Sequence, residues 1–165
     1  MFQATKGLLW LPLYILFLIL ILRHYRWQTL LILVSAALMI TVSDQLSEFF
    51  KHLVQRPRPS HEQGLPVHLV NLYKGGMYGF YSAHASNFFA VALFLTILLK
   101  KYYRWFVWFV MVWAAFLAYT RIYLGVHYPG DSVTGMVMGL CLGYFFGNIT
   151  REVCVNTREW FMGMK

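Results

Sequence analysis

Long apolar runs alternate with short polar connections along the chain. The runs cover residues 7–22, 27–50, 83–99, 105–119 and 132–149. Each is close to the ~20 residues that a helix needs to cross a bilayer, although the shorter runs need aromatic or snorkelling residues at their ends. Because backbone polar groups find no water inside hydrocarbon, helices are the expected structure. The pattern therefore predicts an all-α fold, a polytopic bundle with five transmembrane spans.

The composition agrees with a membrane protein. Hydrophobic residues make up 59% of the 165 residues and charged residues 12%, and the mean hydropathy is +0.56. A soluble protein has about 25% charged residues, so much of this surface is expected to face lipid. The length suits one domain, which we predict to be a single integral-membrane domain over residues 1–165.

The charge balance is basic, with 14 Lys and Arg against 6 Asp and Glu. These residues form short clusters between apolar runs rather than a stripe on a soluble face, so we do not expect a nucleic-acid partner. The connections 23–26 and 100–104 and the tail after residue 150 carry eight of the 14 cations. The positive-inside rule places these connections in the cytoplasm. The remaining connections, 51–82 and 120–131, are then expected to face the periplasm or exterior of a bacterial-type inner membrane.

The two cysteines do not suggest a disulfide or a metal cluster, and the first apolar run does not resemble a signal peptide. Cys141 lies inside the last run and Cys154 beyond it, a placement that suggests neither a disulfide nor a metal cluster. The first run contains Pro12, lacks a small-residue cleavage site and leads into "RHYR". We therefore expect no cleavable signal peptide.

The first polar cluster is "KHLVQRPRP", residues 51–59. It places Lys51 and Arg58 seven residues apart at the end of the second run. Arginine offers a planar fork to phosphate oxygens and lysine adds a point charge. Taken alone, this cluster is more simply interpreted as an ordinary basic boundary followed by a proline-rich turn.

The second cluster, "YSAHASN" at 81–87, precedes the third run. A helix that begins here offers free N–H groups and the positive end of its dipole to an anion, next to His84. In the alternative interpretation, Ser82 only caps the helix and His84 is an interfacial polar residue.

The third cluster is "TRIYLGVHYPGD", residues 120–131. An aspartate near a histidine fixes its tautomer and leaves the other ring nitrogen able to attack an electrophile, which makes His127 and Asp131 a candidate nucleophile and its partner. The alternative is that Asp131 caps the fifth helix and His127 is a surface residue.

All three clusters fall on the same predicted side of the membrane. Ionisable residues at membrane segments indicate function by default. The set of cations, histidines and a serine suits an anion, most simply a phosphate. No carboxylate or Cys/His set fits a metal, so neither a metal nor another cofactor is expected.

The order K-x6-RP, S-x-H and R-x5-H-x3-D resembles the type-2 phosphatidic acid phosphatase (PAP2) superfamily. That superfamily includes lipid phosphate phosphatases and vanadium haloperoxidases. The spacings agree in all three motifs, and the resemblance extends from about Lys51 to Asp131. It departs from the family where Tyr81 and Ala83 replace Pro and Gly and where Thr120 replaces Ser.

The resemblance implies a metal-independent phosphatase acting on a membrane lipid phosphate or pyrophosphate. Undecaprenyl pyrophosphate, phosphatidylglycerol phosphate, phosphatidic acid and lipid A phosphates all fit. His127 would be the nucleophile that forms a phosphohistidine, Asp131 its orienting partner and His84 the general acid and base. The phosphate would be held by side chains or the backbone of Lys51, Arg58, Ser82, Ala83 and Arg121.

Two other functions remain open from the sequence. A non-catalytic protein that binds or transports anionic lipid would need the cations but not the His127–Asp131 pair. A vanadate-dependent oxidase is the third possibility, which the membrane spans disfavour. Membrane members of the superfamily generally have six helices, so a first helix is expected to be missing through truncation, a late start or loss.

Secondary features have structural interpretations. Gly135, Gly139, Gly143 and Gly147 repeat every four residues, which predicts close approach of another helix and a rigid support for Asp131. Asp44 and Glu48 either balance the active-site cations or are polar packing groups. The 60–80 loop is expected to shape the mouth of the site. His61, Glu62, His68 and Lys74 are interpreted as solvated residues of this loop.

Overall fold

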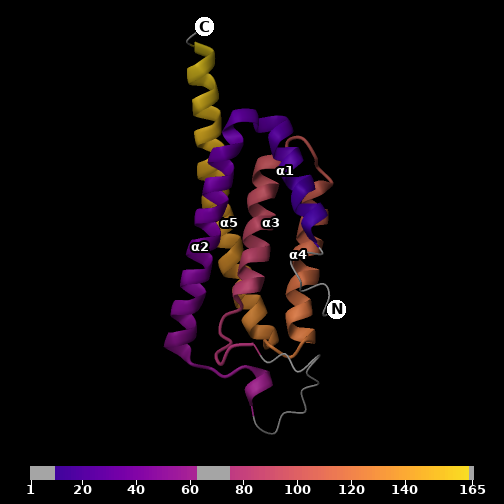
Figure 1. Cartoon of the computed structure of the whole chain (residues 1–165), viewed down its shortest axis with the longest axis vertical. Coiled ribbons are helices and arrows are strands. Elements are labelled where there is room, and N and C mark those ends of the chain that lie inside the picture. Colours follow the sequence, from indigo (N-terminus) through magenta and orange to yellow (C-terminus); the bar gives the residue numbers. More distant parts are fainter. Residues whose placement is uncertain (1–9, 63–74, 164–165) are drawn as a thin grey trace.

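The computed structural model describes residues 10–62 and 75–163, and these residues form a bundle of five long helices. The helices are α1 (Leu11–Tyr25), α2 (Thr29–Val54), α3 (Ala83–Leu99), α4 (Phe106–Tyr123) and α5 (Pro129–Gly163). Two short 3-10 turns, η3 (Arg26–Gln28) and η4 (Pro59–His61), follow α1 and α2. In Figure 1 the helices run up and down the long axis of the molecule. The all-helical prediction is thus confirmed.

The α3 helix is the centre of the bundle. Its buried residues lie on all sides of the helix and include Phe89, Phe94, Leu95 and Leu98. A helix that is apolar all round has to be surrounded by others. Its principal neighbours are α5 and then α4 and α2.

The glycine stripe of α5 explains the close packing against α3. A Cβ atom added to Gly135 would lie 2.5 Å from the carbonyl oxygen of Ser82, and one on Gly143 would lie 2.5 Å from that of Ala90. A Cβ on Gly139 would overlap the carbonyl oxygen of Ser86. The absence of these side chains therefore lets the two backbones touch, as the sequence predicted.

The outer faces of the bundle are apolar. Leu30, Trp108, Val112 and Tyr144 are all more than 60% exposed. Such a surface suits hydrocarbon rather than water. The runs Leu11–Val54, Phe106–Tyr123 and Pro129–Thr157 are long and apolar enough to cross a membrane, and the first of them contains both α1 and α2. The apolar α3 helix is shorter, and the number of five spans stays a prediction.

The two ends of the bundle differ in chemistry. One end carries η3, the α3–α4 connection and the last turns of α5, and we call it the basic end. The opposite end carries residues 55–62, 75–82 and 124–131, and we call it the site end (Figure 1). The three sequence motifs therefore meet at one end, away from the basic connections.

The α5 helix continues well beyond its predicted end. The apolar run stops at residue 149, but the helix extends to Gly163. The tail expected after Thr150 is therefore helical, because polar residues such as Arg151 and Glu152 can extend a helix beyond its apolar part. In Figure 1 this extension projects past the other helices at the basic end.

Candidate active site

Residues from all three motifs are placed at the site end by four helix termini. Lys51 lies in the last turn of α2 and Arg121 in the last turn of α4. Ser82 is the N-cap residue of α3, which places Ala83 and His84 in its first turn. Asp131 lies in the first turn of α5, and His127 lies in the turn between α4 and α5. The structure thus brings together residues that are up to 80 positions apart in the sequence.

Arg58 is held by a short pairing of two extended segments. Pro57 and Tyr78 form an isolated antiparallel bridge, and the Arg58 Nε donates to the carbonyl oxygen of Tyr78 at 3.0 Å. Gly75 has a φ of +68°, and a Cβ there would approach the Arg58 guanidinium to 2.7 Å. Glycine at position 75 therefore allows the segment to close over the arginine.

Lys51 and Arg58 line one pocket of about 300 Å³ at this end of the bundle. Lys51 donates to Glu48 at 3.1 Å, and His52 lies 3.3 Å from the same carboxylate. The idea that Glu48 balances an active-site cation is consistent with this contact. Asp44 instead accepts a hydrogen bond from Asn87 at 2.8 Å, which links α2 to α3 and fits a packing role.

Ser82 connects the second motif to the third. Its hydroxyl accepts from the Ala85 N–H at 3.4 Å and so caps α3, and its own N–H donates to the Asp131 carbonyl at 3.1 Å. The side chain is completely buried. Ser82 therefore caps α3, and its expected role in phosphate binding stays a prediction. The capped helix start places its positive dipole end at the site end of the bundle.

His127 is buried, with 3% of its surface exposed. Burial lowers its pKa to about 3, and the positive charges of Arg58, His84 and Lys51 act in the same direction, while the backbone of Gly79 opposes them. The ring is therefore neutral at physiological pH and has a nitrogen lone pair available. Arg58, His84 and Lys51 are therefore near enough to this histidine to influence its charge.

The His84 ring is exposed and lies edge-on to Phe88 at 6.2 Å. The positive charges of Arg121, Arg58 and Lys51 are all near enough to interact electrostatically with this ring. Arg121 itself is 6% exposed. The guanidinium of Arg121 and the charges of Arg58 and Lys51 thus all reach His84 and create a positive, partly desolvated region, which is the environment that a phosphate dianion favours.

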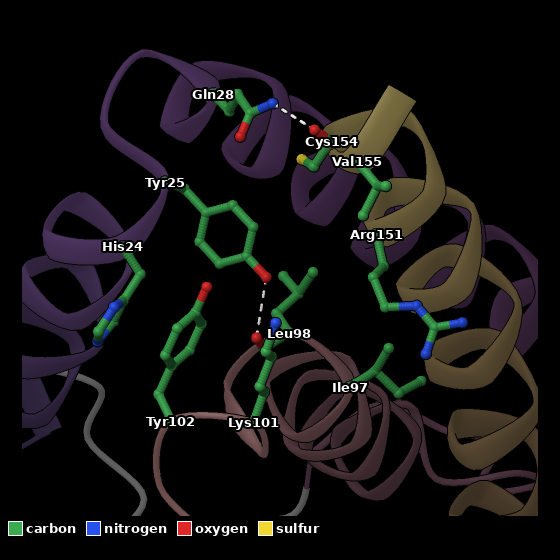
Figure 2. A pocket seen from close by; sticks show the side chains of 10 residues that line it. All are labelled: His24, Tyr25, Gln28, Ile97, Leu98, Lys101, Tyr102, Arg151, Cys154 and Val155. Carbon is green, nitrogen blue, oxygen red and sulfur yellow. Dashed lines mark hydrogen bonds between the residues drawn. The ribbon is translucent and has the colours of Figure 1, made fainter. Parts of the chain in front are cut away.

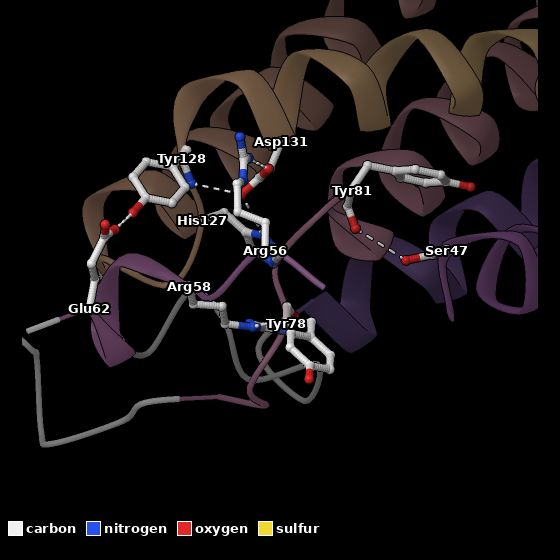
Figure 3. Close-up of polar contacts among 9 residues, drawn as sticks. All are labelled: Ser47, Arg56, Arg58, Glu62, Tyr78, Tyr81, His127, Tyr128 and Asp131. Atoms are coloured by element: carbon white, nitrogen blue, oxygen red, sulfur yellow. Dashed lines mark hydrogen bonds and ion pairs between the residues drawn. The ribbon is translucent and has the colours of Figure 1, made fainter. Parts of the chain in front are cut away.

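Asp131 is fully buried, and its carboxylate contacts His127, Tyr128 and Arg56 (Figure 3). Its Oδ2 lies 3.6 Å from the His127 Nδ1, within ion-pair range but longer than a hydrogen bond. The same oxygen accepts from the Tyr128 N–H at 3.0 Å. Its Oδ1 accepts from Arg56. Hydrogen bonds between catalytic groups are often long before substrate binds, so the geometry suits an orienting carboxylate.

Arg56 is a site residue that the sequence analysis missed. Besides its ion pair with Asp131, its guanidinium lies over the rings of Tyr128 at 4.8 Å and Phe80 at 5.4 Å. The sequence shows only two arginines in "RPRP", and the family motif uses the second. A buried carboxylate needs a cation as its partner, and this need could have pointed to such a residue. The sequence does not show which cation pairs with Asp131.

Two of the four residues singled out in the 60–80 loop are described by the structure. Glu62 accepts a hydrogen bond from the Tyr128 hydroxyl, and the His61 Nδ1 lies 3.2 Å from the Ser60 hydroxyl. His68 and Lys74 lie outside the described residues. Within residues 10–62 and 75–163, no group of three or more His, Cys, Asp and Glu side chains is arranged to hold a metal ion.

Comparison with known proteins identifies the class of this bundle and site. Residues 29–153 match the PAP2 superfamily. The structure resembles that of a transmembrane PAP2-type phosphatidylglycerolphosphate phosphatase from Bacillus subtilis, with a TM-score of 0.66 and 23% identity. The similarity covers 92% of this chain and 73% of that one. This structural similarity shows that the two chains share a fold.

Two relatives are similar in sequence. A lipid A 4'-phosphatase of Bacteroides thetaiotaomicron is 42% identical over 154 residues, which is 90% of this chain and 68% of that protein. A lipid A 4'-phosphatase of Porphyromonas gingivalis is 40% identical over 122 residues, or 72% of this chain and 50% of that protein. The chain belongs to the PAP2 superfamily. The predicted class, a PAP2-type membrane lipid phosphatase, is thus confirmed at the level of the family.

Proposed function

We propose that this protein removes the 4'-phosphate of lipid A or of a lipid A precursor. The similarity to two lipid A 4'-phosphatases supports the substrate. The observation that carries the reaction is the placement of a buried, neutral His127 among Arg58, Lys51 and His84. Cations gathered near a neutral histidine repel one another, and an anion bound between them would relieve this repulsion.

In the proposed mechanism, Lys51, Arg58 and Arg121 bind the phosphoryl oxygens, helped by Ser82 and the Ala83 N–H at the start of α3. They neutralise charge in the transition state, which is usually the largest catalytic contribution. The His127 Nδ1 faces Asp131, so the Nε2 lone pair attacks phosphorus. Asp131 stabilises the positive charge that develops on the ring.

The P–O bond to the lipid breaks as the P–N bond forms. His84 donates a proton to the leaving oxygen and then removes one from water, which attacks the phosphohistidine and releases inorganic phosphate. Lys51, Arg58, His84, Arg121 and His127 thus carry charge and protons without a metal in this scheme. The exposure of the His84 ring fits a group that must meet both lipid oxygen and water.

The proposal includes an orientation. The basic end, with η3 and the α3–α4 connection, lies in the cytoplasm, and the site end faces the periplasm or exterior. The apolar outer faces of the bundle seat it in the inner membrane, with the substrate lipid entering from the leaflet at the site end. The whole chain acts as one catalytic domain.

The test is phosphate release by the purified protein from a panel of lipids. Bis-phosphorylated lipid A, undecaprenyl pyrophosphate, phosphatidylglycerol phosphate and phosphatidic acid are compared, with product position on lipid A assigned by mass spectrometry. We expect the 4'-phosphate to be lost preferentially, in EDTA as in buffer, and His127→Ala to be inactive. Selective removal from another lipid would overturn the substrate assignment. Lipid binding without release from any lipid would favour the non-catalytic alternative.

A further inference from the structure

A second cationic pocket lies at the basic end, at the opposite end of the bundle from His127. It has a volume of about 280 Å³ and is bounded by the α1–α2 turn, the α3–α4 connection and α5. In Figure 2, Arg151 on α5 lies on the opposite side of the pocket from His24 and Tyr102, and in this view its guanidinium points away from them. Lys101 and Leu98 lie below Tyr25 in the same view. None of the catalytic residues proposed above contributes to this pocket.

The lining carries positive charge without a carboxylate. The lining contains Lys101, Arg151 and the ionisable His24, and it contains no Asp or Glu. In the part of the chain that the structure describes, the ion pairs involve neither Lys101 nor Arg151. Lys101 is exposed and Arg151 is partly withdrawn from solvent. An anion bound in the pocket would be attracted by both positive charges.

Hydrogen bonds hold the walls of the pocket in place. The Tyr25 hydroxyl donates to the Leu98 carbonyl at 2.9 Å, which ties α1 to α3. The Gln28 side-chain amide donates to Thr157 at 2.8 Å and to the Cys154 carbonyl, which ties the α1–α2 turn to α5. These contacts keep the three elements apart at a fixed spacing. The pocket is therefore built by the fold and does not depend on the two cations that line it.

The size and surroundings of the pocket indicate a lipid headgroup. Pockets for drug-sized ligands have volumes of about 300–1,000 Å³, so 280 Å³ accommodates a small phosphate-containing group but not a whole lipid. Ile97, Leu98 and Val155 add apolar surface to the lining. Basic pockets between transmembrane helices on the cytoplasmic side are a known way to bind anionic headgroups.

We propose that this pocket binds the phosphodiester headgroup of an anionic phospholipid, such as phosphatidylglycerol, from the leaflet at the basic end. Lys101 and Arg151 contact the phosphate oxygens, while the acyl chains lie along the apolar exterior of the bundle. This lipid is a bound structural partner and is not hydrolysed there. The inference does not depend on which lipid is the substrate at the site end.

The test measures retention of phosphatidylglycerol by the full chain in neutral detergent, using native mass spectrometry. The variant Lys101→Gln/Arg151→Gln removes both pocket cations, and Lys100→Gln/Arg104→Gln removes the same charge from the same basic end outside the pocket lining. We expect the pocket variant to bind phosphatidylglycerol about tenfold more weakly or worse, since each cation near a lipid surface contributes appreciably. The control variant and the exchange Lys101→Arg/Arg151→Lys should retain the lipid. Melting temperature in phosphatidylcholine checks that each variant is folded.

Three outcomes would overturn the proposal. If the pocket variant and the control variant lose lipid affinity equally, the lipid is attracted by the general surface charge and not by the pocket. Unchanged binding in both would show that the pocket is not the lipid site. Displacement of the variant-sensitive lipid by inorganic phosphate alone would assign the pocket to a free anion instead of a headgroup.

Discussion

Arg56 forms an ion pair with Asp131, the carboxylate that also lies 3.6 Å from the His127 Nδ1. The arginine is 41% exposed at its side chain, whereas the aspartate is completely buried. Arg56 therefore reaches inward from the surface, with its guanidinium over the rings of Tyr128 and Phe80, to supply the charge that the buried carboxylate needs. We expect Arg56 to be a positioning residue that acts on His127 through Asp131.

The first prediction concerns this pair. Arg56→Gln leaves a buried charge without its cation, so we expect a loss of about tenfold or more in kcat/KM together with a lower melting temperature. If Arg56 acts through Asp131, the double variant Arg56→Gln/Asp131→Asn should be no less active than Asp131→Asn alone. Additive losses in activity would show that Arg56 works independently. Arg56→Lys should recover part of the activity.

The second prediction separates the two histidines. His127→Ala should be inactive on every substrate, because no phosphoenzyme can form. His84→Ala should be severely impaired on a lipid monophosphate and less so on a nitrophenyl phosphate, because nitrophenolate leaves without a proton. First-turnover bursts isolate this step from the later attack of water. Equal slowing of the burst with both esters would contradict the acid role of His84.

The third prediction concerns Arg121. The change Arg121→Lys preserves the positive charge but removes the planar fork, and the 6% exposure leaves little water to compensate. We expect a loss of at least about tenfold in kcat/KM, or ~1.4 kcal/mol. Lys100→Arg, at the other end of the bundle, is the control. Activity close to that of the parent would make Arg121 a structural cation only.

The fourth prediction tests the α3–α5 contact. A methyl group at position 139 would overlap the Ser86 carbonyl, so Gly139→Ala should cost about 1–3 kcal/mol of stability. It should also lower kcat, because Ser82 and Asp131 would be displaced relative to each other. Gly130→Ala on the same helix meets no atom within 4 Å and should leave the melting temperature almost unchanged. Equal melting temperatures for the two variants would show that the contact tolerates a side chain.

The fifth prediction fixes the orientation. With Cys141 replaced by Ser, a cysteine at the exposed Glu62 should react with a membrane-impermeant reagent added outside spheroplasts. A cysteine at the exposed Arg26 should react only after the membrane is opened. The reverse labelling pattern would place the chemistry in the cytoplasm.

The helices were predictable because apolar length is a local property of the sequence. The start of α3 at Ala83 matches the prediction, since the Ser82 cap and the apolar run coincide there. The true end of α5 was not predictable, because hydropathy falls at residue 149 while the helix continues. The α4 helix likewise extends to Tyr123 and so includes Arg121, which lies beyond the predicted end.

The motif residues could be assigned to one end from topology and spacing alone. The pairing of Arg56 with Asp131 could not, because it joins residues 75 positions apart and depends on the path of the segment after α2. Similarly, spacing placed Asp131 near His127 but did not reveal that Arg56 and the Tyr128 N–H share its oxygens. Contacts of this kind are set by tertiary structure.

The α1 helix has a different place in the molecule from the helices that carry the chemistry. Phe17 packs edge-on against Trp113 and Phe106 of α4, and Trp10 packs against Trp113. None of the proposed site residues lies on α1, whereas α3 and α5 are joined backbone to backbone. The segment from α2 to α5 therefore carries all the proposed site residues, while α1 packs at its periphery. Changes to this peripheral helix are thus expected to affect stability more than the phosphate chemistry.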